Sequence, residues 1–227
     1  MKTAALLLTT ALTLMGAQAP SAEEIVNRMM ERDQARQASL KTYSWMSQYV
    51  LDNKERHAEM MVRWTREEDG SKRYDLLYER GDGAVRDHVF HKLLASEVEA
   101  SQPALQGRNR LNTTNYTFQL SGSEELNGRL AYVLAIEPKL DSKFLVKGRI
   151  WVDAADYAVV KVEGSPAKRP SFWTNAVSFV QTFEKTGDYW MAASNRSVTE
   201  AKMFGEADLV IKHSGYNFKP VVMMAAN

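Results

Sequence analysis

Hydrophobic and polar residues alternate with a period of two along much of this chain. The first such stretch begins at Thr42, where Tyr43, Trp45, Tyr49 and Leu51 fall on one side of an extended backbone. Successive side chains of a β-strand point to opposite faces. The pattern therefore predicts a strand with one buried face and one face toward solvent.

The same alternation recurs downstream in stretches separated by turn sequences such as Asn127-Gly128. Strands that follow one another through short turns of this kind form antiparallel hairpins. The further stretches run over 58–64, 74–78, 116–120, 130–137, 145–152, 157–163, 176–183, 189–199 and 207–216. The sequence therefore predicts about ten antiparallel strands.

Two stretches have helical spacing instead. Ser21 can cap a helix over 23–38, in which Ile25 and Met29 share a face and acidic residues occupy the first turn. From 85 to 100, apolar residues recur at every third or fourth position until Pro103 ends the pattern. The predicted fold is mainly β, of the α+β class: a curved antiparallel sheet that forms an incomplete barrel, covered by two helical segments.

The N-terminus has the features of a signal peptide. Lys2 supplies a positive charge, residues 4–15 are apolar and uncharged, and Ala17 and Ala19 form the small-residue motif of a cleavage site. The apolar run is shorter than the roughly 20 residues that a membrane span needs. We therefore expect a leader over 1–19, with the cut between 17 and 22, and no transmembrane span after its removal.

Composition narrows the class of protein. The chain has no cysteine, so it has neither the disulfides nor the lipid-anchoring cysteine of many exported proteins. It holds 29 Lys and Arg against 28 Asp and Glu, and loss of Lys2 with the leader makes the two counts equal at 28. This balance argues against nucleic acid as a partner. We expect one domain over 20–220, followed by a short tail over 221–227.

Motifs of known enzymes occur only in incomplete form. Ser165 and Lys168 match S-x-x-K and 185–187 matches K-T-G, but the spacing and the missing S-D-N speak against a penicillin-binding enzyme. His88 and His91 share a helix face, yet a metal site needs a third ligand. The sequence therefore predicts no catalytic residues, no metal, no cofactor and no enzyme activity.

Three segments carry a resemblance to a known family. They are 124–134 (EELNGRLAYVL), 148–153 (GRIWVD) and 159–164 (VVKVEG). These strands and turns resemble those of the LolA-like periplasmic lipoprotein carriers and outer-membrane lipoprotein-sorting proteins. The resemblance covers most of the mature chain. It implies an apolar cavity for acyl chains, an inner-membrane donor and an outer-membrane acceptor, and a location in the periplasm.

A concave sheet face that carries large apolar side chains can bury an acyl chain, each methylene of which contributes about 0.8 kcal/mol. Eleven methionines suit an adaptable lining of this kind. From strand periodicity we expect the ligand to contact Tyr43, Trp45, Tyr49, Met60, Trp64, Tyr74, Leu76, Tyr78, Phe118, Leu134, Ile136, Ile150, Phe179 and Phe183. The alternative is that aromatic residues at these positions are ordinary core.

Two further alternatives remain open at this point. A sensor or envelope-assembly protein of the same fold would bind a partner, and a hydrolase would bring polar groups together in a cleft. A set of basic residues is also expected on the convex face, where it could meet anionic head groups or an acidic partner. Its members are Lys139, Lys143, Lys147, Arg149, Lys161, Lys168 and Arg169.

Overall fold

The computed structural model describes residues 19–168, 174–201 and 205–218. The predicted signal peptide up to residue 18, the tail over 221–227, and Arg169 of the basic set therefore lie outside the described residues. Among those that are described, no helix is long and apolar enough to cross a membrane.

Ten antiparallel strands within the described residues form a single sheet, as the alternation predicts. In sheet order the neighbours are β3-β2-β1-β10-β9-β8-β7-β6-β5-β4, so β3 and β4 are the two edges of the described sheet and the barrel is incomplete. The strands are β1 (Tyr43–Asp52), β2 (His57–Arg66), β3 (Lys72–Gly81), β4 (Tyr116–Leu126), β5 (Arg129–Pro138), β6 (Val146–Asp153), β7 (Val159–Pro166), β8 (Thr174–Thr186), β9 (Tyr189–Ala201) and β10 (Gly205–Phe218).

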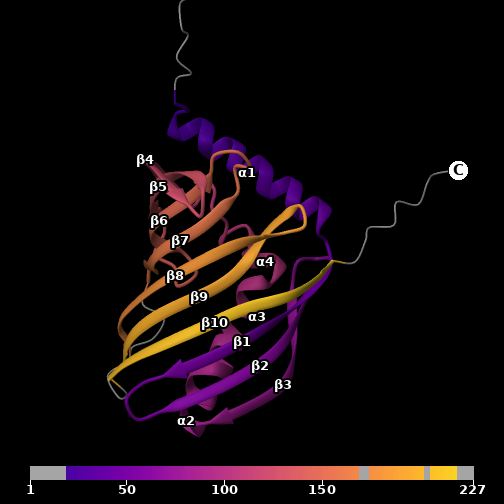
Figure 1. Cartoon of the computed structure of the whole chain (residues 1–227), viewed down its shortest axis with the longest axis vertical. Helices are drawn as coiled ribbons and strands as arrows, with labels where there is room; N and C mark the ends of the chain where they lie inside the picture. The colour runs from indigo at the N-terminus through magenta and orange to yellow at the C-terminus, as the bar shows by residue number, and fades with distance from the viewer. Residues whose placement is uncertain (1–18, 169–173, 202–204, 219–227) are drawn as a thin grey trace, which may run out of the picture.

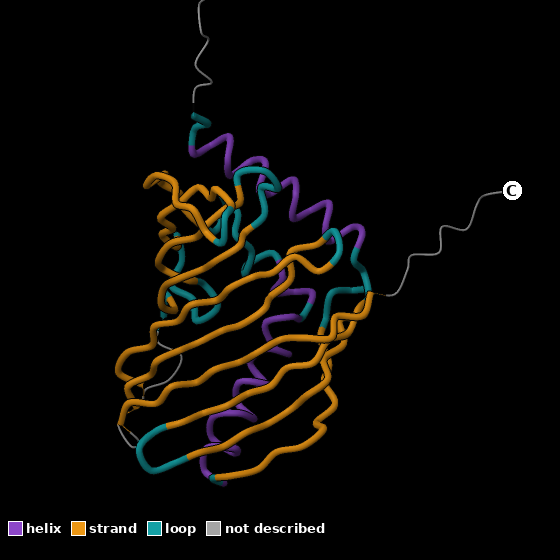
Figure 2. Tube along the Cα trace, viewed as in Figure 1, coloured by secondary structure: helices purple, strands orange, loops and turns teal. Residues whose placement is uncertain are grey.

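Two helical segments cover the concave face of this sheet, which also agrees with the prediction (Figure 1). The first is α1 (Ala22–Ser39), which begins with a capping box between Ser21 and Glu24. The second is broken into α2 (Gly83–Val85), a π-helical turn η1 (Arg86–Phe90), α3 (His91–Ser101) and α4 (Pro103–Gln106). Figure 2 shows this second segment behind the strands, whereas α1 crosses the upper strand ends.

Each helical segment packs on a different part of the sheet. Phe90 and Leu94 of the second segment contact a cluster on β1 and β2 that includes Tyr49, Met60 and Trp64. All five side chains are buried. The first half of α1 forms a second cluster with β4, β5 and β6. Its most buried members are Ile25, Val26, Leu134, Ile136, Leu145, Ile150 and Val152.

A β-bulge in β3 changes the face of the sheet to which the side chains at the end of that strand point. Val62 pairs with Leu76, whereas Met61 pairs with Tyr78, so Leu77 is an extra residue on β3. Simple alternation predicts that Tyr78 shares a face with Leu76. The bulge instead places Tyr78 opposite Met61, on the other face of the sheet from Met60.

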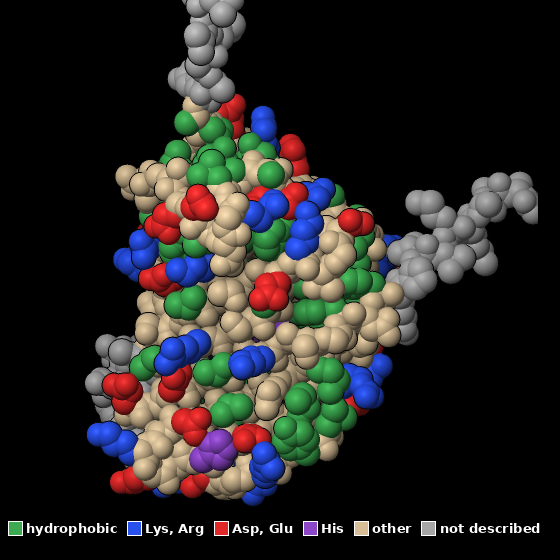
Figure 3. Space-filling view, viewed as in Figure 1, with side chains coloured by type: hydrophobic (Ala, Val, Ile, Leu, Met, Phe, Trp, Pro, Cys, Tyr) green, Lys and Arg blue, Asp and Glu red, His purple; other side chains and the backbone are tan. Residues whose placement is uncertain are grey.

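The convex face has its own small cluster and carries balanced charge. Trp151 is 1% exposed there because Arg149 and Lys161 lie over its ring. The guanidinium carbon of Arg149 is 5.1 Å from the ring centroid, and Nζ of Lys161 is 4.1 Å from it. Both cations also pair with Glu163. Lys147 pairs with Glu137 in the same way. Figure 3 shows basic and acidic side chains interspersed over this face.

The expected basic set is therefore not a uniformly positive patch. In addition to these pairs, Lys143 is bound to Glu99, and Lys139 donates to the carbonyl oxygen of Thr113. Lys168 is exposed. Since most of these cations have a carboxylate partner, the face offers little net attraction to an anionic surface.

Candidate functional site

A cavity of about 680 Å³ lies between the second half of α1 and the middle of the concave face. Its apolar wall comes from strands that are distant in sequence. The main contributors are Tyr43, Trp45, Val162, Phe179, Phe183, Met191 and Tyr216. Cavities of about 300–1,000 Å³ with such walls are typical of small-molecule sites.

The sequence of α1 explains why this space is not filled. The helix presents Ile25, Val26 and Met29 in its first half, and these are buried against the sheet. In its second half the side chains at the cavity are those of Arg32, Asp33, Ala35, Arg36 and Ser39. Charged and small side chains cannot close the gap above the strands, so the core stops where the helix changes character. Arg32 and Ala35 are exposed, which places the mouth of the cavity along α1.

A half-buried ion pair lies at one end of the cavity. Lys72, at the start of β3, is hydrogen-bonded to Glu97 of α3, and both line the cavity. Burial is the largest single influence and alone would lower the pKa of Lys72, but the charge of Glu97 and its hydrogen bond together outweigh burial and the pKa is raised. The Lys72 charge in turn lowers the pKa of Glu97. Both side chains are therefore charged at neutral pH. The Lys72 side chain is 28% exposed and that of Glu97 is 45% exposed, and both contribute to the cavity wall.

His213 of β10 lies in the same wall. Its Nδ1 is 2.8 Å from the hydroxyl of Ser47, a fully buried residue of β1. Burial lowers the pKa of His213 to about 4, with Glu97 acting in the opposite direction. The imidazole is therefore neutral at physiological pH. This end of the cavity combines a fixed ion pair with a neutral ring.

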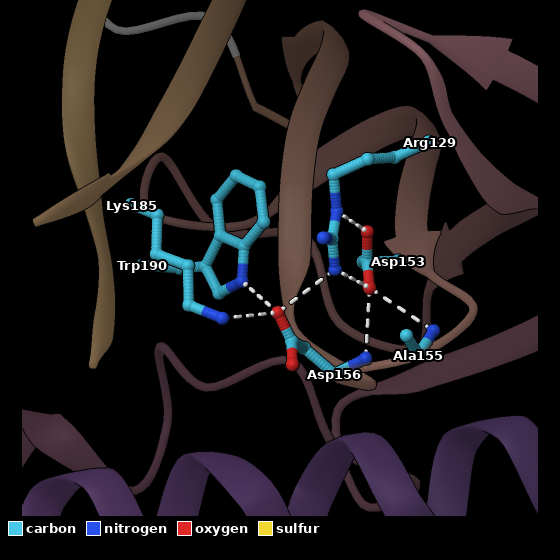
Figure 4. A network of polar contacts seen from close by, with 6 residues as sticks. All are labelled: Arg129, Asp153, Ala155, Asp156, Lys185 and Trp190. Carbon is cyan, nitrogen blue, oxygen red and sulfur yellow. Dashed lines mark hydrogen bonds and ion pairs between the residues drawn. The ribbon is translucent and has the colours of Figure 1, made fainter. Parts of the chain in front are cut away.

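A polar clamp fixes the hairpin that borders the other end (Figure 4). Asp156, in the turn between β6 and β7, accepts from Lys185 Nζ at 2.9 Å and from Trp190 Nε1 at 2.9 Å. Arg129 bridges Asp156 to Asp153, which is 1% exposed. Because Trp190 also lines the cavity, these hydrogen bonds fix the position of the β8–β9 hairpin relative to the cavity.

The same turn also contacts α1. Arg28 donates to the hydroxyl of Tyr157 at 3.0 Å, and its guanidinium carbon is 4.9 Å from the centre of the tyrosine ring. Tyr157 has a φ of 51°, a conformation that costs energy for a residue with a side chain. The turn between β6 and β7 thus connects α1 and the β8–β9 hairpin, two elements that border the cavity.

The structure distributes the fourteen predicted ligand contacts over four places. Tyr43, Trp45, Phe179 and Phe183 line the cavity. The remaining ten do not. Tyr49, Met60 and Trp64 are buried beneath α3. Leu134, Ile136 and Ile150 are buried in the cluster with α1, and the half-buried Phe118 packs against that cluster. Tyr74, Leu76 and Tyr78 lie at the β3 edge, where they are 38%, 45% and 41% exposed.

Several cavity residues were not among those predicted. Gln181 lies between Phe179 and Phe183 at the period-two spacing, and His213 follows Leu209 and Ile211 in the same way, so alternation could have found both. Tyr216 breaks this spacing, because a bulge near Gly215 returns it to the concave face. Lys72 and Glu97 had no local signal, since their pairing depends on how α3 packs.

The incomplete enzyme motifs lie away from this cavity. His91 is 2.8 Å from Glu79 of β3, and its other ring nitrogen is 3.7 Å from Asp87. Ser165 lies within β7, where it pairs with Lys147 of β6. The described part of the chain holds no group of three residues placed to bind a metal ion.

No protein-family model matches this chain, and no curated protein matches it. Similar solved structures include a LolA superfamily protein, NE2245 from Nitrosomonas europaea, at 13% identity, over 89% of this chain and 96% of that chain, with a TM-score of 0.49. A putative outer membrane lipoprotein-sorting protein domain from Vibrio parahaemolyticus is 15% identical over 90% and 96%, with a TM-score of 0.47. A DUF1329 family protein from Desulfovibrio piger is 15% identical over 91% and 96%, also at 0.47.

The first two of these structures carry the names of the group that the sequence resembles. With identities of 13–15% and TM-scores below 0.5, these similarities do not show what this protein does. What the protein binds has to be argued from the cavity.

Proposed function

We propose that this protein is a periplasmic carrier that holds an acyl chain of a lipid or lipoprotein in the cavity under α1. The cavity is the single observation that carries the proposal. It has about 680 Å³ of space beside aromatic and aliphatic side chains, whereas the strands under α3 and under the first half of α1 are packed. Burial of an acyl chain at about 0.8 kcal/mol per methylene would supply the affinity.

The aromatic wall is suited to a flexible apolar ligand. Trp45 stacks on Tyr216, with ring centroids 6.1 Å apart, and Tyr216 stacks on Phe218 at 6.2 Å. Stacked rings of this kind form a rigid surface and require no polar partner on the ligand. Met29 and Met191 add adaptable side chains on opposite walls.

The mouth of the cavity also fits a carrier. It opens along α1, the element that a departing ligand would pass, and α1 is held to the β6–β7 turn through Arg28 and Tyr157. In the proposed function an inner-membrane donor loads the cargo here and an outer-membrane acceptor removes it. The predicted signal peptide supports the periplasm as the place of this exchange.

Two glutamate variants of β8 test the proposal, because neighbouring residues of a strand face opposite sides. Phe179→Glu places a charge in the cavity and should weaken binding of a fluorescent fatty acid at least about tenfold, because the apolar chain would desolvate that charge. Thr182→Glu is the matched control on the convex face, where its neighbour across the sheet is Lys161. It should bind the probe like wild type.

Native mass spectrometry of the protein from its own source gives an independent readout. A co-purified species with the mass of an acylated lipid or lipoprotein, lost in Phe179→Glu, is the expected result. Equal probe binding by wild type and Phe179→Glu, with no co-purified acyl species, would contradict the carrier function.

A sensor or assembly role is the second candidate, and one observation favours it. The β3 edge exposes Tyr74, Leu76, Leu77 and Tyr78 together, each at 38–45%. Exposed apolar residues on an unpaired edge strand are a typical place for a protein partner. A photo-crosslinker at Leu77 that captures an envelope protein only in the ligand-loaded state would favour the sensor over the carrier.

A further inference from the structure

A second, more polar cavity of about 350 Å³ adjoins the first. The two share five lining residues: Arg36, Tyr43, Lys72, Glu97 and Asn109. The second cavity reaches from these residues to the end of α4 and the loop that follows it, where Gln106 and Arg110 complete its wall. An apolar cavity therefore ends at a polar one, and the Lys72–Glu97 pair stands at the boundary.

Basic side chains dominate the second cavity. Within the described ranges its lining includes four cationic residues, Arg36, Arg66, Lys72 and Arg110, and a single carboxylate, that of Glu97. Two of the four cations have acidic partners, since Lys72 pairs with Glu97 and Arg36 with Asp33.

The other two guanidinium groups bond to neutral oxygens within the described residues. Arg66 donates to the carbonyl oxygens of Leu40 and Lys41, at 3.2 and 2.6 Å. Arg110 donates to the side-chain oxygen of Gln37 at 2.6 Å. Asp69 is close enough for Arg66 to contribute to its lowered pKa, but its carboxylate is hydrogen-bonded to Ser71, the larger cause.

We propose that the second cavity binds the phosphate monoester head group of an anionic lipid whose acyl chain occupies the first. This inference rests on the proposed carrier function and narrows its cargo. Two guanidinium groups that bond only to neutral oxygens match a phosphate monoester, which carries about −1.5 to −2 charge at neutral pH, better than they match a carboxylate. Guanidinium forks also suit the geometry of phosphate oxygens.

The position of the ion pair agrees with this division. Lys72 Nζ lies 5.7 Å from the centre of the Trp45 ring, so the ammonium group stands where the aromatic wall ends. A lipid whose chain lies along Trp45 and Tyr43 would bring its head group past Lys72 toward Arg66 and Arg110. Glu97 holds the Lys72 charge in place in the absence of a ligand.

The test compares two lipids with the same acyl chain. Lysophosphatidic acid has a phosphate monoester, whereas lysophosphatidylcholine is zwitterionic, and inorganic phosphate serves as the probe without a chain. Wild type should bind lysophosphatidic acid at least about tenfold more tightly than lysophosphatidylcholine, as expected for charge-assisted hydrogen bonds. Isothermal titration calorimetry measures all three.

Arg110→Gln should lower this preference at least about threefold while the affinity for lysophosphatidylcholine stays unchanged, because only the head-group contact is lost. Arg108→Gln is the matched control, since Arg108 is exposed nearby and does not line the cavity. Arg66→Lys keeps the charge but loses the fork, and should give an intermediate preference. Circular dichroism checks that each variant is folded.

The outcomes separate this inference from the carrier function. Equal affinity of wild type for the two lipids, or an equal loss in Arg108→Gln and Arg110→Gln, would overturn the head-group site and still agree with a carrier. Binding of inorganic phosphate, weakened by Arg110→Gln, with neither lipid bound would support an anion site for free phosphate and contradict the carrier. Absence of binding by all three probes would contradict both.

Discussion

The concave face contains two regions with the same alternation of apolar and polar residues. One region is closed and buried, and the other borders the cavity. Under α3, the strands β1 and β2 contribute Tyr49, Met60 and Trp64, and these residues are 0–5% exposed. Under the second half of α1, β8 contributes Phe179 and Phe183, which are only half-buried beside the cavity. The strand pattern does not distinguish the two regions.

The covering helices account for the difference. The second helical segment inserts Val85, Phe90 and Leu94 into the first region, and these fill the space above the strands. The second half of α1 places charged and small side chains over the other region. Whether an apolar sheet face becomes core or cavity is therefore decided by the helix that faces it.

The largest expected effect comes from a charge in the closed region. Trp64→Glu should destabilise the protein by more than about 4 kcal/mol, enough to unfold it, because the carboxylate would be buried without a partner. Thr65→Glu, one residue along β2, faces the other side and should cost little. Thermal unfolding followed by circular dichroism measures both. A folded Trp64→Glu protein that fails to bind a fatty acid would show that this region is cavity and remove the contrast.

A pH titration compares the cavity with the outer surface. The pKa of His213 is lowered to about 4, so the unfolded chain binds more protons than the folded one between about pH 6.5 and pH 4. The contribution of His213 to the free energy of unfolding is thus complete above about pH 6.5. It decreases by on the order of 3 kcal/mol as the pH falls to about 4. The difference in free energy of unfolding between wild type and His213→Gln, measured in urea at each pH, should follow this curve.

His57 supplies the comparison for that titration. Its hydrogen bonds to Asp52, and then to Glu59, raise its pKa, and the side chain lies on the surface. For a raised pKa the stabilisation is present at low pH and is lost as the pH rises through the folded-state pKa, so His57→Gln should show the opposite trend. Parallel curves for the two variants would show that His213 is not shielded in the cavity wall.

The smallest expected effect compares two phenylalanines. Phe90→Ala removes a fully buried ring from the closed region and should cost about 3 to 4 kcal/mol, because it opens a new void. Phe183→Ala only enlarges the existing cavity and should cost about 1 kcal/mol. Chemical denaturation of both variants measures the difference of about 2 to 3 kcal/mol. Equal costs would mean that the space beside Phe183 is closed in solution.

The sequence predicts the strands and both helical segments because local periodicity reports burial on one face. Ala58, Met60, Val62 and Trp64 occupy the buried side of β2 as alternation requires. The same reasoning failed for Tyr78, because a single extra residue at Leu77 reverses the face and has no signature in the alternation. The ten strands were therefore easier to predict than the side on which each residue lies.

The candidate site was predicted less completely than the fold. Four of the fourteen expected residues line the cavity, and the aromatic positions of β1 and β8 among them follow from strand spacing alone. The polar residues that join the two cavities come from α1, β3, α3 and the loop after α4, and they approach one another only after those elements pack. No local sequence pattern predicts that these distant residues lie close together.

The sequence by itself determined an antiparallel sheet with an apolar concave face and the change within α1 from apolar to charged residues, because both are properties of neighbouring positions along the chain. Only the tertiary structure decided which part of that face stays open, and that Arg66 and Arg110 stand beside the Lys72–Glu97 pair at its end. These depend on volumes and charges brought together from distant segments. Burial and pairing, unlike periodicity, are properties of the folded chain.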